Sequence, residues 1–537
     1  MVMEKEDYPV RGERLFHVLG LLDDGLIKEA EEEHSFHKNV RLRKYGVIGA
    51  AVAAALVLGA VYLPGNSWWR QFSSGSAPRE AGEEMFSEGG AGAGGSGHDA
   101  GSRFMSYAGP VFPMTLLGGE PLGAEREIRY DFASPGKDGE DGRLWGAEVA
   151  DTYVLYNESA EDLKVTALYP FAGSFFSLDK ELPRITTQGG EAETVLYAGN
   201  CAGKYTGKWG EADEQSGSVN LSRPESWEDY REQLADGDYR RQAFGKGQMF
   251  DQRVTVYEFI DNQADLDTYP AATQSIRFDM DPDKTDILVY GFEGSEWDSE
   301  SGQRRYSFSV PDNRTNVTHS KLLIVLGDDI GEYELQGYEN GGCGEGEEIE
   351  GVTSKITRYE AELETVMMRL AEEYLEQYMP EVLSGTEGMV SLEMVNRAVA
   401  GLMYRDGILS EDMEERYEDG RLEEMIGETL SFERVFYLSF DIEIPARSQL
   451  KVEVKLWKEP SHDFAGSGSE NEGVQGYDLM TGLDSCLDFR DVRAALKNAS
   501  LVEIVRQNFG FNLEEGLTEV QLDPGQEHYY MEVRERK

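Results

Sequence analysis

One segment of the chain has a hydrophobic pattern unlike the rest. Residues 45–63 read YGVIGAAVAAALVLGAVYL, nineteen residues without a charge. As an α-helix this segment would be about 28 Å long, close to the thickness of the hydrocarbon core of a bilayer. The pattern therefore predicts a single transmembrane helix, with residues 1–44 on one side of the membrane and residues 64–537 on the other.

The residues that flank this segment predict its orientation. Residues 34–45 contain four basic side chains and no acidic one, whereas Trp68 and Trp69 follow the segment. Lys and Arg gather on the cytoplasmic side of a membrane helix, and Trp favours the interface. We therefore expect a cell-membrane protein with a cytoplasmic N-terminus and an extracellular C-terminal domain. The alternative is a cleaved signal peptide, but its n-region would be 44 residues long and acidic, and no clear A-x-A site follows.

Beyond a flexible Gly/Ser-rich linker at 64–103, alternating apolar positions predict two β-rich regions. The first covers residues 104–350, and its expected strands are Tyr153–Tyr156, Leu163–Phe171, Arg253–Ile260, Ile287–Phe292, Tyr306–Val310 and Lys321–Leu326. The second covers residues 432–537. There Phe436–Ile444 and Leu450–Leu456 alternate on either side of a turn at 445–448, which predicts a half-buried antiparallel pair.

Between these regions, residues 351–431 change to a helical period. Spacings of three and four relate the apolar residues Ile356, Tyr359, Leu363, Met367, Leu370 and Tyr374. Val395, Ala398 and Leu402 predict a second helix, and Ser410 is a suitable N-cap for a third. The predicted fold class is α+β, mainly β: one transmembrane helix, then a β-sandwich-like ectodomain with a helical insertion. Strands before and after the insertion either share a sheet or form separate domains.

The cytoplasmic tail, residues 1–44, is predicted to contain a short amphipathic helix. Leu15, Leu19, Leu22, Leu26 and Ala30 fall on one side of such a helix. Because the tail is too short to build a core, this stripe needs a partner, and a cytoplasmic protein fits better than anionic lipid beside so many acidic side chains. A stripe that folds back or stays partly disordered is the alternative. The expected partner-binding residues are Leu15, Leu19, Leu22, Asp23, Asp24, Leu26 and Ile27.

Charge and cysteine content narrow the function classes. The net charge is −51, and the tail contains eight basic and ten acidic residues, so nearly all of this charge belongs to the predicted outer part. Such acidity argues against nucleic-acid partners, whose phosphates would be repelled. The three cysteines allow at most one disulfide, so the outer part depends on a hydrophobic core for its stability.

Sequence motifs for catalysis or metal binding are missing. None of the seven histidines has zinc-ligand spacing, and no G-x-S-x-G is present. We therefore expect a protein that is not an enzyme and that has no metal or other cofactor. The alternating carboxylates of Asp279–Asp286 could suit calcium, but Lys284 and Tyr290 stand where an EF-hand needs Gly and Glu. We expect a polar turn between strands at Ser275–Phe278 and Ile287–Phe292.

The tail also resembles a known group of proteins. The sequence of Leu19–Ala30, LGLLDDGLIKEA, is followed by basic residues and an Ala-rich span. This arrangement resembles single-pass membrane proteins of Gram-positive bacteria with an IGxIDDxLIEEA-like cytoplasmic head, which are treated as anti-sigma or sensor-like regulators. Leu155–Ser159 with Tyr169–Phe171, and Gln507–Phe511 with Glu527–Tyr530, are similar to ectodomains of that group. The resemblance implies membrane anchoring and a cytoplasmic partner, with a sigma factor as one candidate. The cysteine motif of zinc anti-sigma factors is absent from this tail.

Two function hypotheses follow. In the first, a membrane-anchored regulator or sensor-like protein binds an extracellular ligand through its β-rich domain and a cytoplasmic protein through the tail helix. In the second, the chain is a non-catalytic cell-surface binding or structural protein whose tail is only an anchor.

Overall fold

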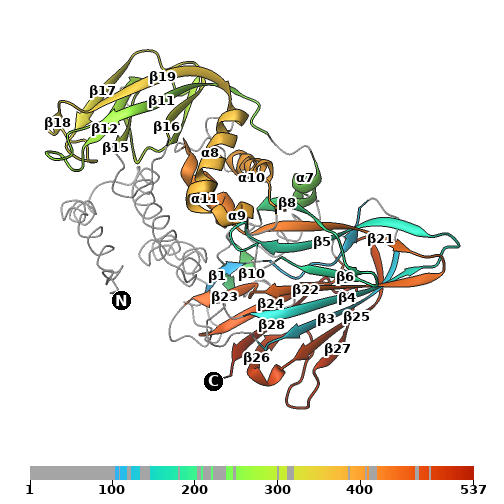
Figure 1. The fold of residues 1–537 in the computed structure, drawn as a ribbon. Helices are drawn as coiled ribbons and strands as arrows, with labels where there is room; N and C mark the ends of the chain where they lie inside the picture. Colours follow the sequence, from blue (N-terminus) through green and yellow to red (C-terminus); the bar gives the residue numbers. More distant parts are fainter. Residues whose placement is uncertain are drawn as a thin grey trace, which may run out of the picture. The chain divides into compact units, whose positions relative to one another are not determined.

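The structure, a computed structural model, describes residues 103–107, 109–117, 122–133, 146–178, 182–201, 207–209, 219–221, 238–245, 249–298, 302–310, 320–384, 388–405, 408–409, 420–465, 471–482 and 485–536. This part is mainly β, with several antiparallel sheets and a few helices (Figure 1). The predicted tail and transmembrane segment lie outside the described residues. Among the helices that are described, none has the length and apolarity needed to cross a bilayer.

Three sheets combine strands from both ends of the described chain. Sheet A contains, in spatial order, β10 (Val219–Leu221), β9 (Gly207–Trp209), β1 (Arg103–Tyr107), β23 (His462–Ala465), β24 (Val474–Met480), β28 (His528–Glu535) and β26 (Val502–Gln507). Sheet B contains β2 (Thr115–Leu116), β5 (Leu163–Gly173), β21 (Arg434–Ile444) and β8 (Val195–Cys201). Sheet C contains β27 (Glu519–Leu522), β25 (Leu487–Lys497), β3 (Leu122–Asp131), β4 (Ala147–Asn157), β22 (Ser448–Lys458), β6 (Arg184–Thr187) and β7 (Gly190–Glu191).

The order of strands in these sheets settles how the two β-rich regions are related. β4 pairs with β22, and β5 pairs with β21, along eleven residues each. Figure 1 shows the teal strands β3 and β4 beside the orange and red strands β22 and β25. Strands from before and after the helices therefore share sheets, and a separate C-terminal β-domain is excluded for the described residues.

The predicted antiparallel pairing of Phe436–Ile444 with Leu450–Leu456 is wrong. Both strands exist and alternate as expected, but β21 belongs to sheet B and β22 to sheet C. The alternating apolar side chains of Phe436–Ile444 and Leu450–Leu456 are buried in the same core cluster. The chain therefore turns a corner between two packed sheets. Alternation identifies the buried face of a strand but not its hydrogen-bonded neighbour.

The consecutive strands β4 and β5 also belong to sheets C and B, so the chain turns the same corner between them. Hydrogen bonds connect this turn to the turn between β21 and β22. Asn157 Nδ2 donates to the carbonyl of Ile444 at 2.8 Å and to that of Glu161 at 2.9 Å. The amide of Ala446 donates to Asp162 Oδ1 at 2.9 Å. Arg447 takes a left-handed backbone with φ of 53° and donates its amide to the carbonyl of Ser159. These bonds satisfy backbone groups that the corner removes from both sheets.

Two further sheets are built from residues that lie in sequence between β5 and β21. Sheet D contains β19 (Thr353–Glu362), β11 (Arg253–Gln263), β16 (Lys321–Gly327), β13 (Thr285–Tyr290) and β20 (Gly420–Arg421). Sheet E contains β14 (Gly294–Asp298), β15 (Gln303–Ser309), β12 (Thr273–Asp279), β17 (Tyr333–Tyr338) and β18 (Glu348–Ile349). Aromatic and aliphatic side chains from both sheets make one core, including Phe259, Phe278 and Phe308. The continuous apolar runs of β13 and β16 arise because sheet D is buried on both faces.

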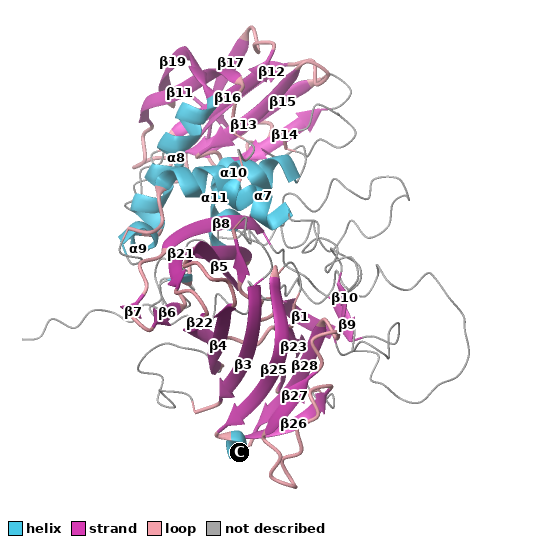
Figure 2. Cartoon of the chain, turned by 90° about the vertical axis from the view of Figure 1, so that its right-hand side faces the viewer, coloured by secondary structure: helices cyan, strands magenta, loops and turns pink. Residues whose placement is uncertain are grey.

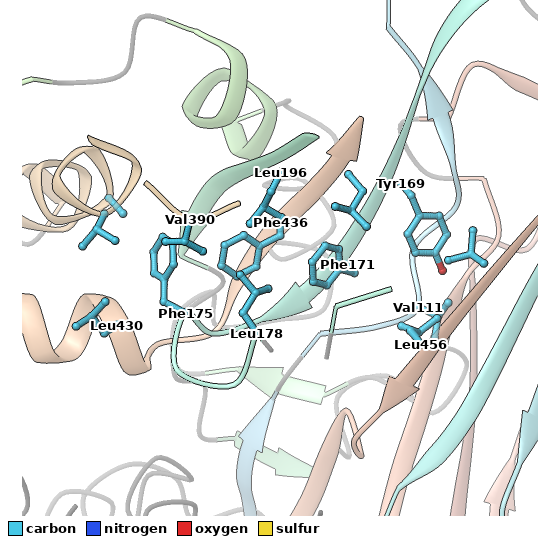
Figure 3. Close-up of a cluster of buried hydrophobic side chains, with 14 of the residues drawn as sticks. Val111, Tyr169, Phe171, Phe175, Leu178, Leu196, Val390, Leu430, Phe436 and Leu456 are labelled. Carbon is cyan, nitrogen blue, oxygen red and sulfur yellow. The ribbon is translucent and has the colours of Figure 1, made fainter. Parts of the chain in front are cut away.

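Helices cover the second face of sheet D (Figure 2). Of these, α8 (Leu363–Tyr378) and α11 (Leu422–Ser431) contact strands of sheet D. α7 (Asp238–Phe244) packs on β8 of sheet B, α9 (Pro380–Ser384) packs on α8, and α10 (Leu392–Arg405) lies against α8, α11 and β8. A 3₁₀ turn at Ala499–Leu501 precedes β26 of sheet A. The predicted stripe of α8 is confirmed from Leu363 to Tyr374, all of whose apolar members are buried. On the other side the helices meet sheet B, where Phe175, Val390, Leu430 and Phe436 lie in one cluster (Figure 3).

Part of the predicted helical region is a strand instead. Ile356 and Tyr359 lie in β19, which pairs antiparallel with β11. In this pairing Arg253 is opposite Glu362, the last residue of β19, and α8 begins at the next residue. Pairing along this edge outweighs the weak helical period of the same residues, which are rich in β-branched side chains. Ser410, the predicted N-cap of the third helix, lies outside the described residues, and the described helix α11 begins at Leu422.

A buried ion pair joins sheets A, B and C. Arg126 on β3 and Asp151 on β4 have fully buried side chains. Arg126 donates Nε–H and one Nη2–H to Asp151 at 3.0 and 2.9 Å, and the other Nη2–H to the carbonyl of Phe112. Its Nη1 donates to the carbonyls of Met480 and Thr481 at the end of β24. All five guanidinium N–H groups are thus used.

Asp151 completes the network toward sheet B. Its Oδ2 accepts from the hydroxyls of Tyr153 at 2.7 Å and Tyr169 on β5 at 3.2 Å. Burial alone would lower the pKa of the Arg126 guanidinium, but Asp151 raises it above its usual value, so the side chain stays charged. Burial, followed by the influence of Asp151, raises the pKa of Tyr169, which therefore remains a hydrogen-bond donor. The pair is fully hydrogen-bonded, which is the condition under which a buried charge is tolerated.

We predict that Arg126→Met lowers the free energy of unfolding by about 3–5 kcal/mol, because it leaves the Asp151 carboxylate buried without its partner. Arg129→Met is the matched control, since Arg129 lies on the same strand but its side chain is 49% exposed and bonds to an exposed Glu127. Its effect should stay within about 0.5 kcal/mol. Urea unfolding of the purified protein measures both. Similar losses for the two variants would contradict a special role for the buried pair.

Candidate functional site

The two histidines that the structure describes lie together in sheet A. His462 is on β23, His528 on β28, and Asp478 lies on β24 between them. Glu532 on β28 and Arg506 on β26 extend the group. These five residues are called the histidine cluster below. His462, Asp478, His528 and Glu532 are each 7% exposed or less, although their side chains are ionisable.

Strand alternation explains which face of sheet A the cluster occupies. Tyr477 packs against Tyr130 and Phe132 of sheet C, with ring centroids 6.1 and 5.7 Å apart. The next residue, Asp478, therefore points to the opposite face of β24. In the register of β24 and β28, Gly476 faces Glu532 and Met480 faces His528. Residues spaced by two on β24 and β28 thus place the cluster along one face.

Asp478 is held as a carboxylate by hydrogen bonds. Burial would raise its pKa, but His528 and, more weakly, His462 and Ser461 lower it to about 2. His528 Nε2 lies 3.1 Å from Asp478 Oδ2. An ionised carboxylate only accepts, so this imidazole nitrogen carries the proton. The backbone amide of Asp478 donates to Ser461 Oγ, which fixes β24 against the residue before β23.

His462 reaches Glu532 across a glycine. His462 and Glu532 both lie opposite Gly476, on the two strands that flank β24. His462 Nε2 is 3.7 Å from Glu532 Oε1. A Cβ at Gly476 would lie 1.9 Å from His462 Nε2, so the imidazole occupies the space that any other residue would fill. The absence of a side chain at position 476 is what allows this contact.

Arg506 supplies the positive charge of the cluster. Its Nε donates to Glu532 Oε2, and its Nη2 donates to Asn471 Oδ1. The cluster also connects to the buried ion pair, because Met480, whose carbonyl accepts from Arg126, pairs directly with His528. Both polar groups therefore depend on the position of β24.

The cluster brings two imidazoles against two carboxylates. Imidazole is the side chain that changes charge near neutral pH. Among the described residues, no group of three or more His, Cys, Asp or Glu side chains is placed to hold a metal ion.

The acidic loop considered for calcium is a turn, as expected. It connects β12 to β13, and Asp281 Oδ1 accepts from the amide of Asp283. The other oxygen of Asp281 pairs with Lys284 at 2.5 Å. An exposed lysine ammonium thus occupies the side of the carboxylate that a cation would need.

The residues predicted from sequence to bind a partner, Leu15, Leu19, Leu22, Asp23, Asp24, Leu26 and Ile27, lie outside the described residues and stay a prediction. Sequence analysis missed the histidine cluster, because no fixed spacing relates His462 to His528. The signal available in the sequence was that ionisable residues, Asp478 and Glu532 among them, lie inside apolar strands at positions where alternation predicts burial.

We predict that Gly476→Ala lowers the free energy of unfolding by about 1–3 kcal/mol, because the methyl group would overlap His462 and force it away from Glu532. Gly482→Ala is the control, since a Cβ there would meet only Phe489 at an ordinary 4.0 Å. Urea unfolding compares the two variants. A destabilisation of Gly476→Ala no larger than that of Gly482→Ala would show that His462 is not confined as described.

Comparison of the chain with protein-family models, curated proteins and solved structures gives no match. A functional conclusion therefore depends on the residue patterns of the chain and on the geometry of its described part.

Proposed function

We propose that the chain is a single-pass membrane-anchored regulator of the sensor-like type. Its N-terminus is cytoplasmic, and its β-sandwich-like part, which includes the helical insertion, is an extracellular binding domain. The observation that carries the proposal is the uncharged segment 45–63, with four basic side chains just before it and Trp68 and Trp69 just after it. The resemblance of Leu19–Ala30 to the heads of sensor-like regulators supports the same reading.

The described strands support a mechanical connection to the membrane. β1 begins at Arg103, the last residue of the predicted linker, and pairs with β23 on one side and β9 on the other. The first described strand of the chain is thus an interior strand of sheet A. A change in the position or stability of the strands of sheet A would therefore be transmitted to the linker through β1.

The tail supplies the proposed output. Its predicted helix presents Leu15, Leu19, Leu22 and Leu26 to a cytoplasmic protein, with Asp23 and Asp24 available to basic residues of that partner. A sigma factor is one candidate. In the alternative function, a surface binding or structural protein, the same tail would be only an anchor.

Topology is tested with alkaline phosphatase fusions in a bacterial expression host. We predict activity for a fusion after Gly101 and none for a fusion at Lys38, because the enzyme is active only after export. The opposite pattern would reverse the orientation and refute the proposal.

Regulation is tested in the tail. We predict that Leu22→Asp changes the same set of transcripts as deletion of residues 1–33, because burying one leucine contributes about 1.5–3 kcal/mol and a charge there removes it. Glu32→Lys, beyond the apolar stripe, should leave those transcripts at the wild-type level. If the deletion changes no transcripts, the surface-protein alternative is preferred.

A further inference from the structure

The strand β19 forms one edge of sheet D, and it lies at the margin of that sheet in Figure 2. It pairs with β11 on one side, and no described strand pairs with its other side. With ten residues, β19 is the longest edge strand among the sheets that the structure describes. The next longest, β8 with seven residues, is packed against α7 and α10. Among the described edges, β19 is therefore the one best suited to pair with another strand.

The backbone groups on the open side of β19 belong to every second residue. The amide of Leu363 donates to the carbonyl of Gln252 at 2.9 Å, so these two residues form a hydrogen-bonded pair at the end of the ladder. Hydrogen-bonded and non-hydrogen-bonded pairs alternate along antiparallel strands, and no bulge interrupts the pairing over residues 355–362. The N–H and C=O groups that point away from β11 are therefore those of Ile356, Arg358, Glu360 and Glu362. These four residues are called the outward row below.

The side chains of β19 have a balanced charge, which is unusual in this chain. The whole sequence has 102 acidic and 51 basic residues. In contrast, β19 contains two basic and two acidic residues, all exposed: Lys355, Arg358, Glu360 and Glu362. Like charges on an edge strand would keep two acidic molecules apart. The balanced charge of β19 removes that repulsion at this edge.

The order of these charges favours one register of pairing between two copies of β19. If a two-fold axis passes through Tyr359, Arg358 of each copy lies opposite Glu360 of the other copy, because each is one residue from the axis. Both residues belong to the outward row, so their backbones can also bond to each other. An axis at Arg358 or at Glu360 would instead place that residue opposite its own copy, and like charges would meet.

We propose that two copies of the chain associate through β19, which pairs antiparallel with β19 of the second copy about a two-fold axis at Tyr359. The two D sheets then form one continuous sheet. The outward row supplies the hydrogen bonds between the copies, and the two contacts between Arg358 and Glu360 set the register. The inference goes beyond the proposed function, and it does not require the membrane anchor.

Cysteine cross-linking of the full-length protein in detergent tests the position of the axis. The two Tyr359 residues would form a non-hydrogen-bonded pair, with Cα atoms about 4.5 Å apart, which is within the range of a disulfide. Tyr359→Cys should therefore give a disulfide-linked dimer on mild oxidation. Thr357→Cys is the matched control and should not, because residue 357 lies opposite Ala361 of the second copy. Wild-type protein measures cross-linking through the native cysteines.

Charge reversal combined with analytical ultracentrifugation tests the contacts. Glu360→Arg would place two basic side chains at each contact with Arg358 and should weaken dimerisation by at least about tenfold. Glu362→Arg is the matched control, because residue 362 lies opposite Ile356 of the second copy. Both carboxylates contact Arg253 within their own copy, at 3.7 and 3.3 Å. The control should change the dimerisation constant by no more than about twofold.

The double variant Arg358→Glu with Glu360→Arg exchanges the two charges and should restore most of the association. Arg358→Glu is used only in this combination, because Arg358 also binds Asp329 at 2.7 Å within its own copy. A monomeric wild-type protein would overturn the proposal and would leave β19 to a strand of a different protein. Dimerisation that Glu360→Arg leaves unchanged, or equal cross-linking of Tyr359→Cys and Thr357→Cys, would also overturn it.

This proposal and the proposed function fail separately. The phosphatase fusions report the topology whatever the oligomeric state is. The variants of β19 report self-association whatever the topology is.

Discussion

The fully buried ion pair between Arg126 and Asp151 is the constraint on which the three-sheet part of the fold depends. Placing a guanidinium and a carboxylate in an apolar core is costly unless every donor and acceptor finds a partner. Here Arg126 bonds to the end of β24 in sheet A, and Asp151 accepts from Tyr169 in sheet B. The pair therefore requires sheets A and B to meet sheet C at one place, whereas apolar contacts alone would tolerate small shifts.

This requirement has consequences for the rest of the molecule. β24 must end where Met480 and Thr481 can accept from Arg126, which fixes the register that sets Asp478 beside His528 and Gly476 between His462 and Glu532. The paired corners at Asn157 and Arg447 then carry two strand pairs from sheet C to sheet B. The histidine cluster is thus positioned by a second polar group, which bonds to the end of the same strand.

Sequence patterns predicted the strands far better than their partners. Alternation in Leu163–Phe171 and Phe436–Ile444 reports burial on one face, and both strands are present. It carries no information on which strand lies alongside, so the sheet assignment of β21 and β22 was missed. Ile356 and Tyr359 fitted a helical period by chance, and pairing with β11 decided their structure. The histidine cluster could not be assembled from the sequence because it depends on the register across β23, β24 and β28. Ionisable residues inside apolar strands indicate burial, but they do not indicate which of them lie together.

The most direct test of the central claim is a double-mutant cycle between Arg126 and Tyr169, which contact Asp151 from sheets C and B. Unfolding free energies of Arg126→Met, Tyr169→Phe and the double variant give the coupling energy. If Asp151 unites the sheets, the two substitutions are not additive, and the coupling should be about 1 kcal/mol or more. Additivity to within about 0.3 kcal/mol would show that the two residues act independently and would contradict the account.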